Sequence, residues 1–244
     1  MVHKTSLTIA VPFYNEEDSI KNFKMQLESL LNKLKDVSIK VLLVDDGSND
    51  NTHALLHDLF HMNEDVHIIQ HANNQNLGGF LKTCQNLCTT DYIVFLDSDC
   101  TFDPMLILEM IKTRNFGQID IINGSPFHPD GSLKGVKKSR SLLSKISNLS
   151  YRLLINRNVY TYTSIFKMYK SSVFTKVQIE TIGFVSVCEV FVKCLLNGAS
   201  IVEFPCSLEL REYGESKIRI LQSVKNHFLF LSKLIFIKLK LIKL

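Results

Sequence analysis

The stretch at residues 91–99 reads Asp-Tyr-Ile-Val-Phe-Leu-Asp-Ser-Asp. Its apolar centre predicts a buried strand, and Asp97 and Asp99 follow where that strand ends. A carboxylate beside an apolar core is costly unless something pairs with it, and hard cations such as Mg²⁺ or Mn²⁺ prefer carboxylate oxygens. The pattern therefore favours a metal site at Asp97 and Asp99. The alternative is a pair of aspartates that turn or cap the chain before the next helix.

Two earlier stretches have the same form. Residues 7–18 read Leu-Thr-Ile-Ala-Val-Pro-Phe-Tyr-Asn-Glu-Glu-Asp, and residues 39–50 read Ile-Lys-Val-Leu-Leu-Val-Asp-Asp-Gly-Ser-Asn-Asp. In each, an apolar strand ends in a polar cluster and a helical stretch follows. Three such units predict an α/β fold with a mostly parallel, Rossmann-like central sheet flanked by helices. Ligands of such sheets bind beyond the carboxyl ends of the strands, where the polar clusters fall.

These polar clusters resemble the three signature blocks of family 2 glycosyltransferases with the GT-A fold. The blocks are Val-Pro-Phe-Tyr-Asn-Glu-Glu at 11–17, Val-Asp-Asp-Gly-Ser-Asn-Asp at 44–50, and Asp-Ser-Asp at 97–99. A fourth block, Glu-Phe-Pro at 203–205 with Arg-Glu-Tyr-Gly-Glu-Ser-Lys at 211–217, resembles the C-terminal signature of dolichol-phosphate mannose synthases and their polyprenyl-phosphate relatives. The resemblance implies a GT-A glycosyltransferase domain over residues 1–218.

The resemblance implies an inverting, metal-dependent transfer of a hexose from a GDP- or UDP-sugar to a polyprenyl phosphate. The implied nucleotide-sugar site comprises Pro12, Tyr14, Glu16, Val44, Asp46, Asp97, Ser98, Asp99, Arg211 and Lys217. Tyr14 offers a stacking face, and Asp46 offers an acceptor for a ring N–H. Arginine has a fork of donors that suits diphosphate oxygens. The alternatives are turn and cap chemistry for Asp45 and Asp46, and a solvated charged loop for Arg211 and Lys217.

Further residues are assigned to the metal, the acceptor and the chemistry. Asp97, Asp99 and Thr101 are the candidate ligands of Mg²⁺ or Mn²⁺, with helix capping as the alternative for Thr101. By resemblance, the candidate catalytic residues are Asp99, Glu189 and Arg211. Glu189 follows Gly183-Phe184 in an apolar stretch, and it would orient the acceptor or pair with Arg211. Arg140 and Lys137 would hold the acceptor phosphate, unless they are ordinary surface charge at a helix start.

Four positions depart from the family pattern, and one of them is Ile165, which replaces glycine. Pro126 follows Gly124-Ser125 where relatives usually carry arginine, and Thr161 stands where they often have aspartate. Asn76 occupies a usual glycine position. The departures argue against mannose and dolichol in particular, and they leave the nucleotide half of the pattern intact.

Composition limits the other classes of protein. The chain has 244 residues, 45% hydrophobic and 21% charged, as expected for a globular domain with a sizeable core. The net charge of +4 is small, and no basic run is interleaved with aromatics, which argues against a nucleic-acid partner. Six cysteines without Cys-x-x-Cys spacing predict reduced thiols. With no signal peptide recognised at Met1-Val-His-Lys, we expect a cytoplasmic protein.

Residues 219–244 are apolar and basic, without an acid. On a helical projection one sector collects Lys225, Ser232, Lys233, Lys240 and Lys243, and Lys238 lies outside it. The lysines interrupt the apolar run too often for a transmembrane span. The pattern therefore predicts an amphipathic helix that lies on the cytoplasmic face of a membrane. The alternative is a terminal helix docked on its own domain or on a partner helix.

The periodicity also predicts the remaining elements. Strands are expected at 6–12, 39–45, 66–70, 92–97, 119–124, 162–169 and 200–204. Helices are expected at 16–35, 51–62, 77–88, 104–113, 139–156, 171–175, 186–196 and 218–243. Residues 124–138 predict a loop that could form an acceptor-side lid.

Two other functions stay open. One is a transferase of the same fold that acts on a sugar hydroxyl during surface-polysaccharide or glycoprotein-glycan assembly, which would need a general base. The other is a non-catalytic scaffold that binds nucleotide sugars, against which the intact Asp97 and Asp99 argue.

Overall fold

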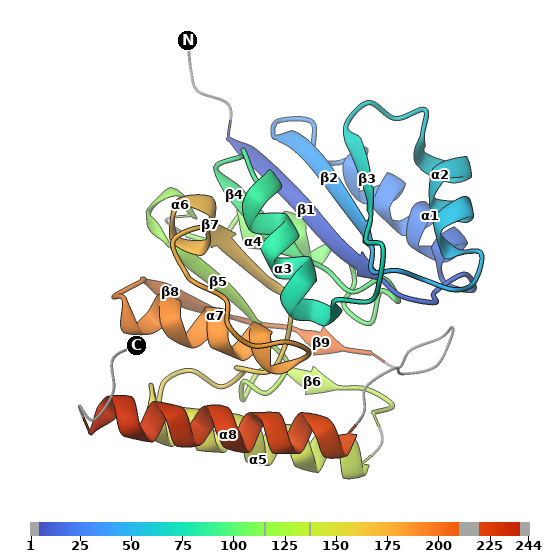
Figure 1. The fold of residues 1–244 in the computed structure, drawn as a ribbon. Coiled ribbons are helices and arrows are strands. Elements are labelled where there is room, and N and C mark those ends of the chain that lie inside the picture. Colours follow the sequence, from blue (N-terminus) through green and yellow to red (C-terminus); the bar gives the residue numbers. More distant parts are fainter. Residues whose placement is uncertain (1–4, 115, 137, 210–219, 240–244) are drawn as a thin grey trace.

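The computed structural model describes residues 5–114, 116–136, 138–209 and 220–239 (Figure 1). Its centre is a seven-stranded sheet in the order β3-β2-β1-β4-β7-β5-β8. The strands are β1 (Ser6–Phe13), β2 (Ser38–Asp45), β3 (Val66–Gln70), β4 (Tyr92–Phe95), β5 (Ile121–Ser125), β7 (Lys167–Lys170) and β8 (Ile201–Pro205). All neighbours pair in parallel except β7, which is antiparallel to β4 and β5. A second sheet pairs β6 (Ser132–Leu133) with β9 (Ser207–Leu208).

Helices cover both faces of the sheet (Figure 1). They are α1 (Ile20–Leu31), α2 (Thr52–Phe60), α3 (Asn76–Leu87), α4 (Leu106–Ile111), α5 (Lys138–Leu154), α6 (Ser171–Phe174), α7 (Val185–Leu196) and α8 (Ile220–Lys238), with a 3₁₀ turn at Phe116–Gln118. One core cluster joins the sheet to α1, α2 and α4, and the other joins it to α3, α6 and α7 and to parts of α5 and α8. The expected α/β architecture is confirmed.

The central strands are apolar on both sides because helices cover both faces. Within β1, Ile9 and Val11 belong to the cluster with α1, while Ala10 between them belongs to the cluster with α3. All three are fully buried. Near-continuous apolar runs, with polar residues only where a strand ends, follow from this arrangement.

Helix α8 forms as expected, and it docks on its own domain. Phe230 and Leu234 are buried in the second core cluster. The helix packs on α5 and α7, and the three lie together beyond the sheet (Figure 1). Other apolar residues of α8 point to solvent, among them Phe228 and Phe236. The helix therefore has a docked face and an exposed apolar face.

The structure differs from three predictions of secondary structure. The strand expected from residue 162 begins at Lys167, since the Asn148 side chain accepts the N–H groups of Tyr162 and Thr163. The helix expected from residue 16 begins at Ile20, and residues 17–19 form a turn in which the N–H of Ser19 donates to the carbonyl of Glu16 (3.0 Å). The predicted loop at 124–138 contains β6, which pairs with β9.

Phe95 is the last residue of β4, and its ring holds the core beneath the Asp97–Asp99 turn. It contacts the rings of Phe80, Phe174 and Tyr169, with centroids 5.8, 5.2 and 5.9 Å away. We expect Phe95→Ala to lower the free energy of unfolding by about 3–5 kcal/mol, because a buried ring leaves a cavity. Denaturant unfolding measures this, with exposed Met25→Ala as the control. A loss as small as that of the control would contradict the assigned packing.

Candidate active site

The predicted signature blocks meet at one edge of the sheet. Because β1, β2 and β4 are parallel, their carboxyl ends lie together, and Phe13 pairs with Asp45 in register. The N–H of Asp46 donates to the carbonyl of Phe13 (2.8 Å), and the N–H of Leu96 donates to that of Ala10 (3.1 Å). The carboxyl ends of β3, β5 and β8 share this edge. The prediction that the three blocks lie at one edge of the sheet is confirmed.

Hydrogen bonds that involve side chains connect the first two signature blocks. The N–H of Asn15 donates to Ser48 Oγ (2.9 Å), and the Asn15 amide oxygen accepts the N–H of Asn49 (2.8 Å). The N–H of Glu16 donates to Thr52 Oγ1 (2.8 Å), and the Glu16 side chain is buried. These bonds hold the turn after β1 against the turn after β2.

Three non-glycine residues with positive φ follow strands at this edge. They are Asn15 (52°), Asn76 (59°) and Cys100 (53°). The backbone of an L-residue is strained in this region, and the surrounding hydrogen bonds must hold it there. The turn at Gly47 (φ 73°) also needs glycine, because an added Cβ would lie 2.7 Å from the carbonyl carbon of Asn73.

The two carboxylates after β2 have internal partners. Asp45 is fully buried, its Oδ1 accepts the N–H of Ser48 (3.0 Å), and its Oδ2 lies 3.6 Å from His53 Nδ1. Oδ1 of Asp46 accepts from His71 Nδ1 (2.7 Å) and from the N–H of Gln75 (2.8 Å). The turn and cap contacts left open by the sequence are thus present, and nucleotide binding by Asp46 stays a prediction.

Burial raises the pKa of Asp46 above its ordinary value of 3.8, although hydrogen bonds from His71 and from the amino end of α3 work in the opposite direction. When His71 Nδ1 donates to Asp46, its Nε2 accepts from the hydroxyl of Thr83 (2.8 Å). Sequence reasoning missed His71 and Thr83. The available signal was that His71 directly follows β3, the parallel neighbour of β2.

The Asp97–Asp99 turn follows β4 as predicted. Both aspartates are half-buried, and Ser98 between them is buried. Asp99 Oδ1 accepts the N–H of Thr101 (3.1 Å), and the Thr101 carbonyl accepts the N–H of Glu209 (2.9 Å). In the turn before α4, Asp103 Oδ1 accepts the N–H of Met105 (2.8 Å), and at α4 itself the N-cap residue Met105 has no side-chain capping bond, from Thr101 or any other residue.

The chemistry of this turn fits a hard cation. Within the described ranges, no three His, Cys, Asp or Glu side chains gather into a metal site. Two carboxylates completed by substrate phosphates are a typical arrangement for Mg²⁺. Asp97 and Asp99 supply that pair.

The other predicted nucleotide residues are distributed around this edge. Pro12 and Tyr14 are half-buried at the end of β1, whereas the Val44 side chain is fully buried in the core. Arg211 and Lys217 lie outside the described residues.

The predicted acceptor residues are only partly described. Lys137 and the side chain of Arg140, at the start of α5, lie outside the described part of the chain. Glu189 lies on α7 with no exposed surface, and its carboxylate pairs with Lys193 at 2.7 Å. Thr161 bonds Ser125 Oγ (2.8 Å) and accepts the N–H of Phe127 (3.2 Å).

A row of polar side chains that the sequence did not indicate crosses β7, β5 and β8. Lys167, Asn123 and Glu203 are cross-strand neighbours on β7, β5 and β8. Asn123 Nδ2 donates to Glu203 Oε1 (2.6 Å), while Lys167 Nζ donates to the carbonyl of Ser164. Burial lowers the pKa of Lys167 to about 8.

Fold and site together define an α/β enzyme with an acidic turn at the carboxyl edge of its sheet. A model of the family described as Glycosyl transferase family 2 matches residues 8–178. The chain belongs to this family, and it is a nucleotide-sugar-dependent glycosyltransferase.

Similar proteins agree with this assignment. Polyprenol monophosphomannose synthase of Mycolicibacterium smegmatis is 25% identical over 217 residues, covering 86% of this chain and 80% of that protein. Undecaprenyl-phosphate mannosyltransferase of Micrococcus luteus is 26% identical over 223 residues, covering 87% and 86%. The fold is similar to that of glucosyl-3-phosphoglycerate synthase from Mycobacterium tuberculosis, solved with Mn²⁺, uridine diphosphate and glucosyl-3-phosphoglycerate, with TM-score 0.69, 14% identity, and 93% and 80% coverage.

The pKa of Asp46 leads to a test of stability. A carboxyl with a raised pKa contributes stability below its unfolded pKa and loses it as the pH rises through its folded pKa. Asp46→Asn keeps an oxygen acceptor and removes this loss. We therefore expect the stability of the variant, relative to the wild type, to increase as the pH rises from below 3.8 through the raised pKa and then level off. Urea unfolding over a pH series measures the free energy of unfolding of both proteins. A value for the variant that falls relative to that of the wild type as the pH rises would contradict the assigned burial.

Proposed function

We propose that this glycosyltransferase moves a hexose from a nucleotide sugar to a polyprenyl phosphate at a membrane surface, with inversion and with the help of a divalent cation. The observation that carries the donor half is the Asp97–Asp99 turn, set beside the polar turns that follow β1 and β2. The lipid acceptor is supported by the similarity to polyprenol monophosphomannose synthase and undecaprenyl-phosphate mannosyltransferase, and by an exposed apolar surface on α5 and α8.

On the donor side, Tyr14 would stack on the base and Asp46 would accept its ring N–H. Asp97 and Asp99 would hold Mg²⁺ or Mn²⁺, with Thr101 as a further candidate ligand. When bound, the cation stabilises the negative charge that develops on the departing diphosphate. Arg211 and Lys217 would neutralise the same oxygens.

On the acceptor side, Arg140 and Lys137 would bind the lipid phosphate. One phosphate oxygen forms the new bond to the anomeric carbon, and the bond from that carbon to the diphosphate breaks on the opposite face. The acceptor phosphate is already an anion, so the reaction needs no strong general base.

The membrane surface consists of the exposed apolar residues of α5 and α8, here called the α5–α8 surface. These residues are Leu142, Leu143, Ile146, Leu149 and Leu153 on α5 and Val224, Phe228, Leu229, Ile235, Phe236 and Leu239 on α8. The two helices lie side by side (Figure 1), and a hollow of about 360 Å³ between them is lined by Leu153, Phe228 and Ile235 among others. Apolar surface beside lysines suits the interface of an anionic membrane.

Among the described helices, none is long and apolar enough to cross a bilayer.

The lysines of α8 are not all available to lipid. Lys225 is exposed, whereas Lys233 pairs with Glu180 and Lys238 donates to the carbonyl of Leu154 (3.0 Å). The apolar contacts therefore carry a larger share of the proposed membrane binding than the lysine sector alone suggested.

The metal role is tested with Asp99→Asn. We expect it to abolish transfer, because it removes charge from the proposed cation site, and we expect chelation to abolish transfer by the wild type. Wild type or variant is incubated with radiolabelled nucleotide sugars and membranes. The mixture is extracted with organic solvent, and the label in the organic phase is counted. The matched control is Asp103→Asn, which keeps the oxygen that accepts the N–H of Met105 before α4. Transfer that survives both Asp99→Asn and chelation would refute the metal assignment.

Membrane binding is tested with surface variants, because removing α8 would also uncover the core around Phe230 and Leu234. We expect Leu149→Asp and Phe228→Asp each to reduce co-sedimentation with vesicles that contain anionic lipid, since each places a charge on the α5–α8 surface. The control is Met62→Asp, because Met62 is exposed on the loop after α2 and is not part of the α5–α8 surface. Salt should weaken binding without abolishing it, because salt does not screen the apolar contacts. Equal binding by all three variants would refute this surface.

A further inference from the structure

The segment 177–183, between α6 and α7, packs directly on α3. Gln85 of α3 donates from Nε2 to the carbonyls of Phe174 (2.8 Å) and Val177 (2.7 Å). At the other end of α3, a Cβ added to Gly78 would lie 2.4 Å from the carbonyl oxygen of Thr181. The first turn of α3 and the segment are therefore in contact with no space for a side chain between them.

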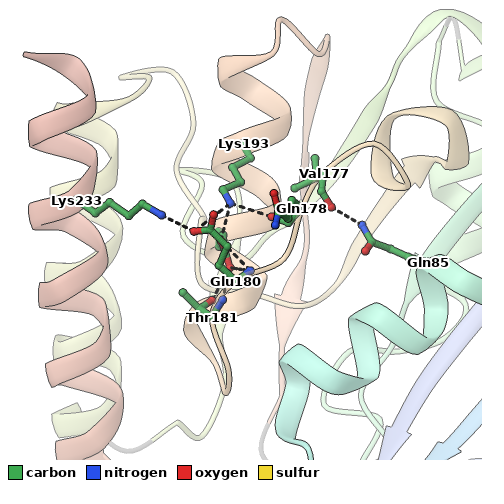
Figure 2. A network of polar contacts seen from close by, with 8 residues as sticks. Gln85, Val177, Gln178, Glu180, Thr181, Lys193 and Lys233 are labelled. Atoms are coloured by element: carbon green, nitrogen blue, oxygen red, sulfur yellow. Dashed lines mark hydrogen bonds and ion pairs between the residues drawn. The ribbon is translucent and has the colours of Figure 1, made fainter. Parts of the chain in front are cut away.

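A buried ion pair holds the same segment from the side of α7 (Figure 2). The carboxylate of Glu189 accepts the N–H of Thr181 (2.8 Å), the Thr181 hydroxyl (2.6 Å) and the N–H of Glu180 (3.2 Å). Lys193 Nζ lies 2.7 Å from Glu189 Oε1 and donates to the carbonyl of Gln178 (2.8 Å). Both charges thus have partners within the fold, and those partners belong to one segment.

The segment is also tied to α8. The carboxylate of Glu180 pairs with Lys233 of α8 and lies 3.6 Å from Lys193 (Figure 2). The hydrogen bond from Lys233 is the main reason why the pKa of Glu180 lies below its ordinary value. Glu180 therefore joins the helix of the α5–α8 surface to the buried Glu189–Lys193 pair.

The far end of this chain of contacts is the donor side of the site. The residue before α3, Gln75, donates its N–H to Asp46, and Asn76 next to it has positive φ. Support of the first turn of α3 by Thr181 therefore also supports the geometry around Asp46.

We propose that Glu189 and Lys193 are positioning residues that hold segment 177–183 as a brace against the amino end of α3, and that the Glu180–Lys233 pair couples this brace to α8. The inference rests on the proposed function for its donor side. In this proposal the carboxylate of Glu189 binds segment 177–183 and does not contact the acceptor. Breaking a buried ion pair costs much more stability than breaking a half-exposed one. The Glu189–Lys193 pair therefore contributes most of the stability of the brace, and the Glu180–Lys233 pair contributes a smaller part.

Hydrogen exchange of the full chain tests the brace. We expect Glu189→Gln to speed exchange at the amides of Glu180 and Thr181 by about 100-fold or more, and at the first turn of α3 to a smaller extent. Lys233→Ala should speed exchange of the same amides by up to about fivefold. Lys225→Ala is the matched control, because it removes an equal charge from α8 and Lys225 is exposed. It should leave segment 177–183 unchanged, and Lys233→Arg should restore wild-type rates.

A second variant keeps the test decisive if Glu189→Gln does not fold. Gly78→Ala pushes on Thr181 from the α3 side, and we expect faster exchange at Glu180 and Thr181. Effects of Lys233→Ala confined to α8, or equal to those of Lys225→Ala, would overturn the coupling. Effects of Gly78→Ala confined to α3 would overturn the brace.

Calorimetry with UDP and GDP separates this inference from the proposed function. We expect Lys233→Ala, at an unchanged melting temperature, to bind the nucleotide more weakly than Lys225→Ala does. Equal affinities would overturn the link to the donor site. A wild type that binds neither nucleotide would overturn the proposed function and that link, while the exchange rates would still decide whether the brace exists.

Discussion

The carboxylate of Asp46 connects β2, β3 and α3 through hydrogen bonds. It follows β2, it accepts from the histidine that follows β3, and it accepts from the residue that precedes α3. A buried carboxylate is tolerated only when donors surround it, so these elements must stay in register around it. The position of α3 in turn determines where segment 177–183 can pack. The end of β2, the end of β3 and the start of α3 therefore share one buried carboxylate.

How much the sequence predicts depends on how local each interaction is. The strands before Asp45 and Asp97 are recognisable because each apolar run and its polar end are adjacent in the chain, and parallel pairing brings such ends together. The contact between Asp46 and His71 depends on the pairing of β2 with β3, so no spacing in the chain announces it. The partners of Glu189 are main-chain groups of a segment without periodicity, and a sequence pattern carries no information about them.

The terminal helix illustrates the same limit. Its wide apolar face predicts a helix that must cover something, yet periodicity cannot divide that face between core and surface. The structure buries Phe230 and Leu234 and exposes Phe228 and Phe236. Two departures from the family pattern also become intelligible only in three dimensions. Thr161 is hydrogen-bonded on both sides of Pro126, so the positions where relatives carry aspartate and arginine are neighbours, and both have become neutral here.

The left-handed residues Asn15, Asn76 and Cys100 stand at the rim of the site, each held in a conformation that glycine would adopt without cost. Replacement by glycine would relieve local strain, but it would also widen the range of shapes that the rim can take in the native state. Selection for thermal stability and selection for catalytic turnover would then favour different residues at these positions. Evolved or engineered descendants of this enzyme should consequently gain robustness in the helices and the core, while the bends after β1, β3 and β4 resist such improvement.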